Sequence, residues 1–113
     1  FVNEGEVKFL EEEGFEVVAE MGLGLDETQA ERRAINRVPP EAVIRMARAV
    51  DRPDADAIFI SCTALPTVTV IDRIEQERGK PVVTSNQATF WNVLRSMGLG
   101  LRIEGYGSLL RDH

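Results

Sequence analysis

The chain has 113 residues, of which 43% are hydrophobic and 28% are charged, and this predicts one soluble globular domain over residues 1–113. The net charge of −6 and the absence of any Lys/Arg run argue against a nucleic acid or an anionic membrane as partner. A single cysteine excludes an internal disulfide and a metal site built from thiolates, and a reducing cytoplasm is the expected location. No apolar stretch reaches the roughly eighteen residues of a membrane span, so we expect neither membrane insertion nor export.

The first third of the chain has the pattern of two helices around one strand. Apolar positions from Asn3 to Glu13 follow a helical stripe, and Gly14 stands where such a helix stops. Residues 15–19 then predict a strand, and Asp26 can cap a short helix that runs through Asn36. Because the chain opens on a helical pattern, we expect a further segment to precede it.

A third helix begins at Pro39-Pro40, since proline fits the first turn of a helix. Its inward positions recur at helical spacing, and they are Val43, Ile44, Ala47 and Val50. Arg45 and Arg48 fall on the opposite side. We therefore expect one face of this helix to be buried and the arginines to face water.

Two further strands alternate with helices in the second half of the chain. The short apolar run 57–60 predicts a strand buried on both faces, followed by a helix from Thr67 through Arg78. Residues 81–84 predict the next strand. The helix after it is expected to be capped by Ser85 or Asn86.

The only cysteine, Cys62, stands between the strand 57–60 and the next predicted helix. Ligands of open α/β sheets bind at the carboxyl ends of the strands, so this position favours a site. The amides from Thr63 to Val68 would lie at the positive end of the helix, where they favour a thiolate and can hold a carboxylate. The alternative is that Cys62 is a small buried hydrophobic residue, as lone cysteines most often are.

The order of these elements predicts an α/β fold with a doubly wound parallel sheet, because strands that alternate with helices require crossover connections. A flavodoxin-like sheet has its first strand at the centre, between the predicted strands 15–19 and 57–60. That strand has no counterpart in this sequence. Its absence would leave backbone groups of both neighbours without partners.

Around the cysteine the sequence contains the runs Ser61-Cys62-Thr63-Ala64-Leu65-Pro66-Thr67, Val70-Ile71-Asp72 and Gly79-Lys80-Pro81-Val82-Val83-Thr84-Ser85-Asn86-Gln87-Ala88, followed by Trp91, Leu94-Arg95 and Gly98. With these residues it resembles one branch of the aspartate/glutamate racemase superfamily, the branch of maleate cis-trans isomerases and arylmalonate decarboxylases. It extends in weaker form over nearly the whole chain.

This resemblance implies a carboxy-terminal, flavodoxin-like half of a two-half enzyme that binds a small carboxylate between its halves and uses no cofactor. Cys62 would be the catalytic cysteine of this half, and the amide of Thr63 would help to hold a substrate carboxylate. The candidate substrate-binding residues are Ser61, Thr63, Ala64, Ser85 and Asn86. The second catalytic position would belong to a missing amino-terminal half or to a second subunit.

Three reactions remain open for such a cysteine, and each needs an acid or a base beside a carboxylate. The resemblance implies that an isomerase adds one cysteine to the double bond of maleate, while in a racemase one cysteine removes the proton α to the carboxylate and another donates a proton on the opposite face. A decarboxylase needs one cysteine, which protonates the enediolate after carbon dioxide leaves. In a different class, the chain would be a catalytically inactive fragment or partner half.

Overall fold

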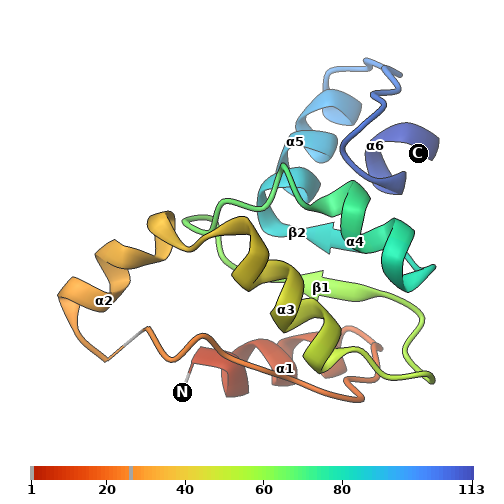
Figure 1. Cartoon of the computed structure of the whole chain (residues 1–113). Coiled ribbons are helices and arrows are strands. Elements are labelled where there is room, and N and C mark those ends of the chain that lie inside the picture. Colours follow the sequence, from red (N-terminus) through yellow and green to blue (C-terminus); the bar gives the residue numbers. More distant parts are fainter. Residues whose placement is uncertain (1, 26) are drawn as a thin grey trace.

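The computed structural model describes residues 2–25 and 27–113 and confirms the α/β class (Figure 1). Strand β1 (Ile58–Ile60) pairs with β2 (Val82–Thr84) in parallel, with Ile60 opposite Thr84. Helix α4 (Ile71–Arg78) forms the crossover between them and ends at Gly79, whose φ of 68° is the left-handed conformation that glycine adopts without cost. The sheet has these two strands within the described part of the chain.

Further helices precede and follow this pair of strands in the chain. Their bounds are α1 (Val2–Glu12), α2 (Gln29–Ala34), the 3₁₀ turn η1 (Ile35–Arg37), α3 (Pro40–Val50), α5 (Ser85–Ser96) and α6 (Ser108–Asp112). No described helix combines the length and the apolar character that a membrane span requires.

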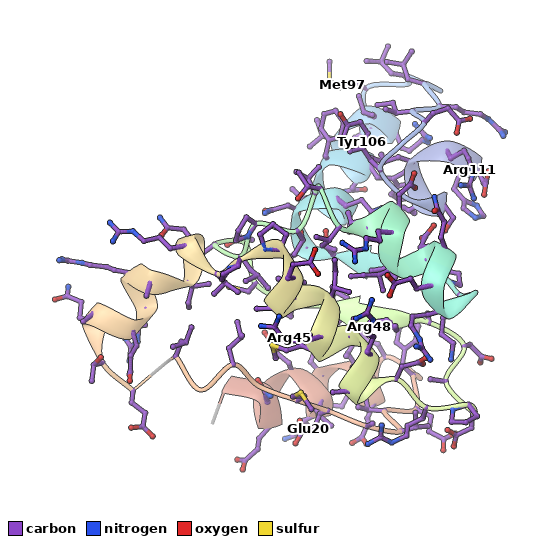
Figure 2. All side chains as sticks on the ribbon, viewed as in Figure 1. Glu20, Arg45, Arg48, Met97, Tyr106 and Arg111 are labelled. Carbon is purple, nitrogen blue, oxygen red and sulfur yellow. The ribbon has the colours of Figure 1, made fainter. Side chains whose placement is uncertain are left out.

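The core lies on one face of the sheet, between the strands and helices α3 and α4. Buried side chains of this core come from both strands and both helices, and they include Val43, Ile44, Ala47, Ile58, Ile71, Ile74 and Val82. Arg45 and Arg48 lie on the exposed side of α3 as predicted (Figure 2), and Arg48 binds Glu77 of α4. The opposite face of the sheet is open at Phe59 of β1, which is 48% exposed, so the prediction that this strand is buried on both faces was wrong.

The predicted strand at residues 15–19 is not formed, and that prediction was wrong. The segment is irregular and Phe15 is 64% exposed. A strand is stabilised by hydrogen bonds to a neighbouring strand, and the described residues offer this segment none. Residues 15–19 have the pattern of a strand, but no neighbouring strand in the described part of the chain pairs with them.

Helix α4 begins later than predicted, at Ile71 instead of Thr67. The four residues before it form turns, one of them closed by a bond from the Val70 amide to the Thr67 carbonyl. All four of these residues, Thr67, Val68, Thr69 and Val70, are β-branched, and β-branched side chains lower helix propensity. The amides from Thr63 to Val68 therefore do not belong to the start of α4.

The cap of helix α5 is also different from the prediction. Thr84, the last residue of β2, is the N-cap, and its hydroxyl accepts a hydrogen bond from the Gln87 amide while the Gln87 side chain accepts one from the Thr84 amide. Ser85 and Asn86 are therefore free of the capping role. In α2 the cap is Thr28, paired in the same way with Glu31, and the predicted cap Asp26 lies outside the described residues.

The end of the chain is fastened to α4 by two carboxylates. Asp72 accepts a hydrogen bond from the Gly107 amide at 2.9 Å, and Glu75 accepts bonds from the amide and hydroxyl of Ser108. A Cβ atom at Gly107 would lie 2.4 Å from Ile71 Cγ2, so the chain can pass α4 this closely only as glycine. This anchor places the tail against α5 and β2.

Candidate active site

The residues around Cys62 lie at the carboxyl edge of the sheet, where the sequence places them. Ser61, Cys62 and Thr63 follow β1 directly, and α5 starts directly after β2. Because Ile60 is opposite Thr84 in a parallel register, the chain beyond β1 and the first turn of α5 emerge side by side. The fold thus brings the two predicted groups of site residues together.

Two side chains of α5 bind the backbone around Cys62. The Cys62 amide donates a hydrogen bond to Ser85 Oγ at 3.3 Å, and Asn86 Nδ2 donates one to the Thr63 carbonyl at 3.0 Å. Both bonds are available because Thr84 and Gln87 cap the helix. Ser85 and Asn86 therefore contact the protein's own backbone in this structure.

The backbone turns back immediately after the cysteine. The Leu65 amide donates to the Cys62 carbonyl at 3.2 Å, which closes a turn over residues 62–65. The carbonyls of Cys62 and Thr63 are thus occupied, whereas the amides of Thr63 and Ala64 have no acceptor among the residues described. Both residues are exposed, so two adjacent N–H donors are available to an anion. We call residues 61–65 the Cys62 turn.

Cys62 itself is a free, half-buried thiol that packs against the hydrophobic core. Its φ of 150° is positive, a region that residues with a Cβ atom rarely occupy. Such a conformation costs about 1 to 3 kcal/mol and persists only where the surrounding structure holds it. The cysteine is therefore partly a core residue and partly a strained residue at the edge of the sheet.

Ser61 is held from the opposite side by a residue that sequence reasoning missed. Its hydroxyl donates a hydrogen bond of 2.7 Å to Glu6 Oε1 of α1. The two residues are 55 positions apart and belong to no common motif, so no local pattern could have paired them. Helix α1 is thereby connected to the Cys62 turn.

The helix end nearest the cysteine is not the one predicted. Helix α4 starts at Ile71, beyond the Cys62 turn, whereas Ser85, the first residue of α5, bonds the Cys62 amide. A helix N-terminus therefore does lie beside the turn, but it belongs to the following βα unit. The described residues contain no group of three or more His, Cys, Asp or Glu side chains that could hold a metal ion.

A groove of about 280 Å³ lies beside this turn and extends toward the tail. Asn86 contributes to its wall, together with residues of the loop before α4, of α5 and of the tail, among them Pro66, Thr67, Val68, Phe90 and Tyr106. Cys62 is not part of this wall.

Comparison with known proteins identifies the family. The family model described as arylmalonate decarboxylase matches residues 1–110. The chain belongs to this family. It is 33% identical over 107 residues to the maleate isomerase of Nocardia farcinica, and the match covers 94% of the chain and 41% of that protein. It is 35% identical over 112 residues to the arylmalonate decarboxylase of Bordetella bronchiseptica, with 98% and 46% covered.

A solved structure of one such relative has the same fold. It is a cysteine-to-serine variant of the N. farcinica maleate cis-trans isomerase with a covalently bound succinylcysteine intermediate, and it matches at a TM-score of 0.87 and 32% identity. The match covers 99% of the chain and 44% of that structure. The chain thus spans under half the length of the relatives it matches.

Proposed function

We propose that this chain supplies one half of a cofactor-independent isomerase that converts a small cis-dicarboxylate of the maleate type into its trans isomer, with Cys62 as a catalytic group. The observation that carries the proposal is the Cys62 turn, where the only thiol of the chain stands next to two free amides. The succinylcysteine in the related isomerase supports covalent chemistry at a cysteine of this fold.

The chemistry begins with a thiolate that adds to one carbon of the double bond. The π electrons move to the other carbon and onto its carboxylate, which leaves a single C–C bond that rotates. A group on the opposite face donates a proton to that other carbon, which gives a succinyl thioether, and takes the proton back before expulsion of the thiolate restores the double bond in the trans geometry. Cys62 is either the thiolate that adds or the group that manages the proton on the opposite face.

The free amides of Thr63 and Ala64 suit this reaction because negative charge accumulates on a substrate carboxylate during addition. Backbone donors held in place before the reaction stabilise such charge without reorganising. We further propose that the hydroxyl of Ser61 borders the same space. The opposing catalytic group then comes from an amino-terminal half or from a second subunit.

A decarboxylase of the arylmalonate type is the second candidate, and two observations favour it. The matching family model carries that activity in its description, and the identity to the Bordetella enzyme is 35%. In this reaction the C–C bond to one carboxylate breaks, carbon dioxide leaves, and Cys62 donates its proton to the carbon of the resulting enediolate. One cysteine is sufficient for this, and the chain has one.

A panel of substrates offered to the complete protein distinguishes these reactions. Loss of maleate absorbance with formation of fumarate supports the isomerase, and release of carbon dioxide from phenylmalonate supports the decarboxylase. Loss of optical activity from L-aspartate, followed by circular dichroism, would instead indicate a racemase. Turnover of phenylmalonate or aspartate without turnover of maleate contradicts the proposed isomerase.

The isolated 113-residue chain provides the contrast to the complete protein. A two-sided reaction needs a group on each face of the substrate, so we expect this chain alone to show no turnover of maleate. Such a result would agree with a half that is inactive without its partner. Measurable isomerisation by the isolated chain would contradict the requirement for a second half or subunit.

A further inference from the structure

Ser85 and Asn86 were expected to contact substrate, but their bonds in the structure indicate a different task. We propose that they are positioning residues that act through the Cys62 turn, together with Glu6. They hold the backbone so that the amides of Thr63 and Ala64 stay directed at a substrate carboxylate. This inference rests on the proposed function, since it concerns the same site.

The first argument is the conformation of the cysteine. A φ of 150° at Cys62 is unfavourable for a residue with a side chain, so neighbouring groups must hold it. The bond from the Cys62 amide to Ser85 fixes the peptide group before the strained residue. The turn bond to Leu65 fixes the carbonyl that follows it.

The second argument is the direction of the two free amides. A peptide group is planar, so a carbonyl that points into the protein sends its amide the opposite way. The carbonyl of Cys62 faces Leu65 and that of Thr63 faces Asn86, which directs the N–H groups of Thr63 and Ala64 away from both partners. Asn86 therefore sets the orientation of the Ala64 amide without touching the ligand.

The third argument is that α5 is itself held firmly. Gln87 is buried, accepts from the Thr84 amide and donates from Nε2 to the Tyr106 carbonyl at 2.7 Å. The first turn of α5 is thus fixed between β2 and the tail. On the other side of the Cys62 turn, Glu6 holds Ser61 at 2.7 Å. The turn is therefore held from α1 and from α5.

The single cysteine allows a test that needs no enzymatic activity, because alkylation of this chain reports on Cys62 alone. Iodoacetate carries a carboxylate and iodoacetamide is its neutral analogue. The ratio of their alkylation rates, divided by the same ratio for the urea-unfolded chain, measures the preference for a carboxylate at this thiol. We expect this normalised ratio to exceed one in the folded chain, and a value of one would overturn the inference.

Variants of the two α5 residues then separate positioning from simple stability. We expect S85A and N86A each to lower the normalised ratio about fivefold, the effect of one lost hydrogen bond, while S85T retains the hydroxyl and the ratio. N92A is the matched control, because Asn92 is an exposed asparagine further along the same helix. A merely structural role would lower the unfolding midpoint and leave the ratio unchanged, and that result would overturn the inference, as would an equal effect of N92A.

The role of Glu6 is tested by comparing two variants that both remove its charge. E6Q keeps an acceptor for the Ser61 hydroxyl and E6A does not, so their difference reports the hydrogen bond alone. We expect the ratio to be about fivefold lower in E6A than in E6Q, and equal ratios would overturn the role of Glu6. Absence of turnover by the complete protein would overturn the proposed function while leaving these ratios as valid evidence on positioning.

Discussion

The amino-terminal segment and the remainder of the molecule differ sharply in how completely their side chains are buried. From Val38 to Leu110, side chains of α3, α4 and both strands form a buried core. Among the described residues 3–25, in contrast, none is buried, and Phe9 and Phe15 are 61% and 64% exposed. In the well-packed region, the sequence pattern of each helix or strand favours its structure, and the elements that it packs against belong to this chain.

This difference shows how helices and strands depend on their surroundings. Helix α1 forms because its backbone bonds are internal to the helix. Residues 15–19 have a strand pattern and remain irregular because a strand takes its bonds from a neighbour. The Cys62 turn stands between the two regions, connected to α5 by Ser85 and to α1 by Glu6.

The largest expected effect comes from a cavity in the packed region. Ile71 is 1% exposed, so I71A should destabilise the chain by about 2 to 5 kcal/mol through lost burial and an unfilled cavity. F15A should change the free energy of unfolding by less than about 0.5 kcal/mol because its ring is exposed. Urea unfolding followed by circular dichroism measures both.

If I71A fails to fold, I71V tests the same point with an expected loss of about 0.5 to 1.5 kcal/mol. If F15A lowered the free energy of unfolding as much as I71V, residue 15 would lie in a packed environment. That result would contradict the contrast between the amino-terminal segment and the packed core.

The next effect concerns the close approach of the tail to α4. Gly107 and Gly105 have nearly equal φ values, 91° and 89°, but a Cβ at Gly107 meets Ile71 at 2.4 Å and one at Gly105 meets nothing within 4 Å. G105A should cost about 1 to 2 kcal/mol for its backbone conformation. G107A should cost a further 1 to 3 kcal/mol, roughly, from overpacking.

Thermal unfolding of both glycine variants measures the difference directly. Both variants place a side chain at a positive φ, and G107A adds the contact with α4. Equal stability of G105A and G107A would show that the tail does not pack on α4 as described.

The third effect is dependent on pH. The hydrogen bond from Lys80, with a second from Arg78, lowers the pKa of Asp51 below its ordinary value of 3.8. A lowered pKa stabilises the fold above 3.8, and this contribution is lost as the pH falls through the folded-state value. D51N should therefore lose about 1.5 to 3 kcal/mol at pH 7 and progressively less toward pH 2.

Unfolding free energies of wild type and D51N across pH 2 to 7 give this contribution as their difference, so that titration of other carboxylates cancels. A difference that stays constant over the range would mean that the Asp51–Lys80 contact does not depend on the charge of Asp51.

Much of the site could be predicted from the sequence because it depends on strand ends. The pairing of Cys62 with Ser85 and Asn86 follows from two parallel strands that end at one edge. The N-cap at Thr84 could also have been found, since Gln87 stands three residues later as in a capping box. The bond between Glu6 and Ser61 could not, because only the tertiary fold brings them together.

The fold was predictable where a local sequence pattern determines the structure of a segment. It was less predictable where that structure depends on a neighbouring strand. Pro40 and the spacing of Val43, Ile44 and Ala47 specify α3 without reference to other elements. Residues 15–19 have an equally clear pattern, but their structure depends on a strand that this sequence does not supply.

The central claim is that Cys62 is a catalytic group, and one measurement tests it most directly. The complete protein and its C62A variant would be compared for conversion of maleate to fumarate under the same conditions, with circular dichroism confirming that both are folded. The account predicts that C62A loses at least about 10² to 10⁴ in rate, the usual contribution of a positioned acid or base. Equal rates in the two folded proteins would contradict it.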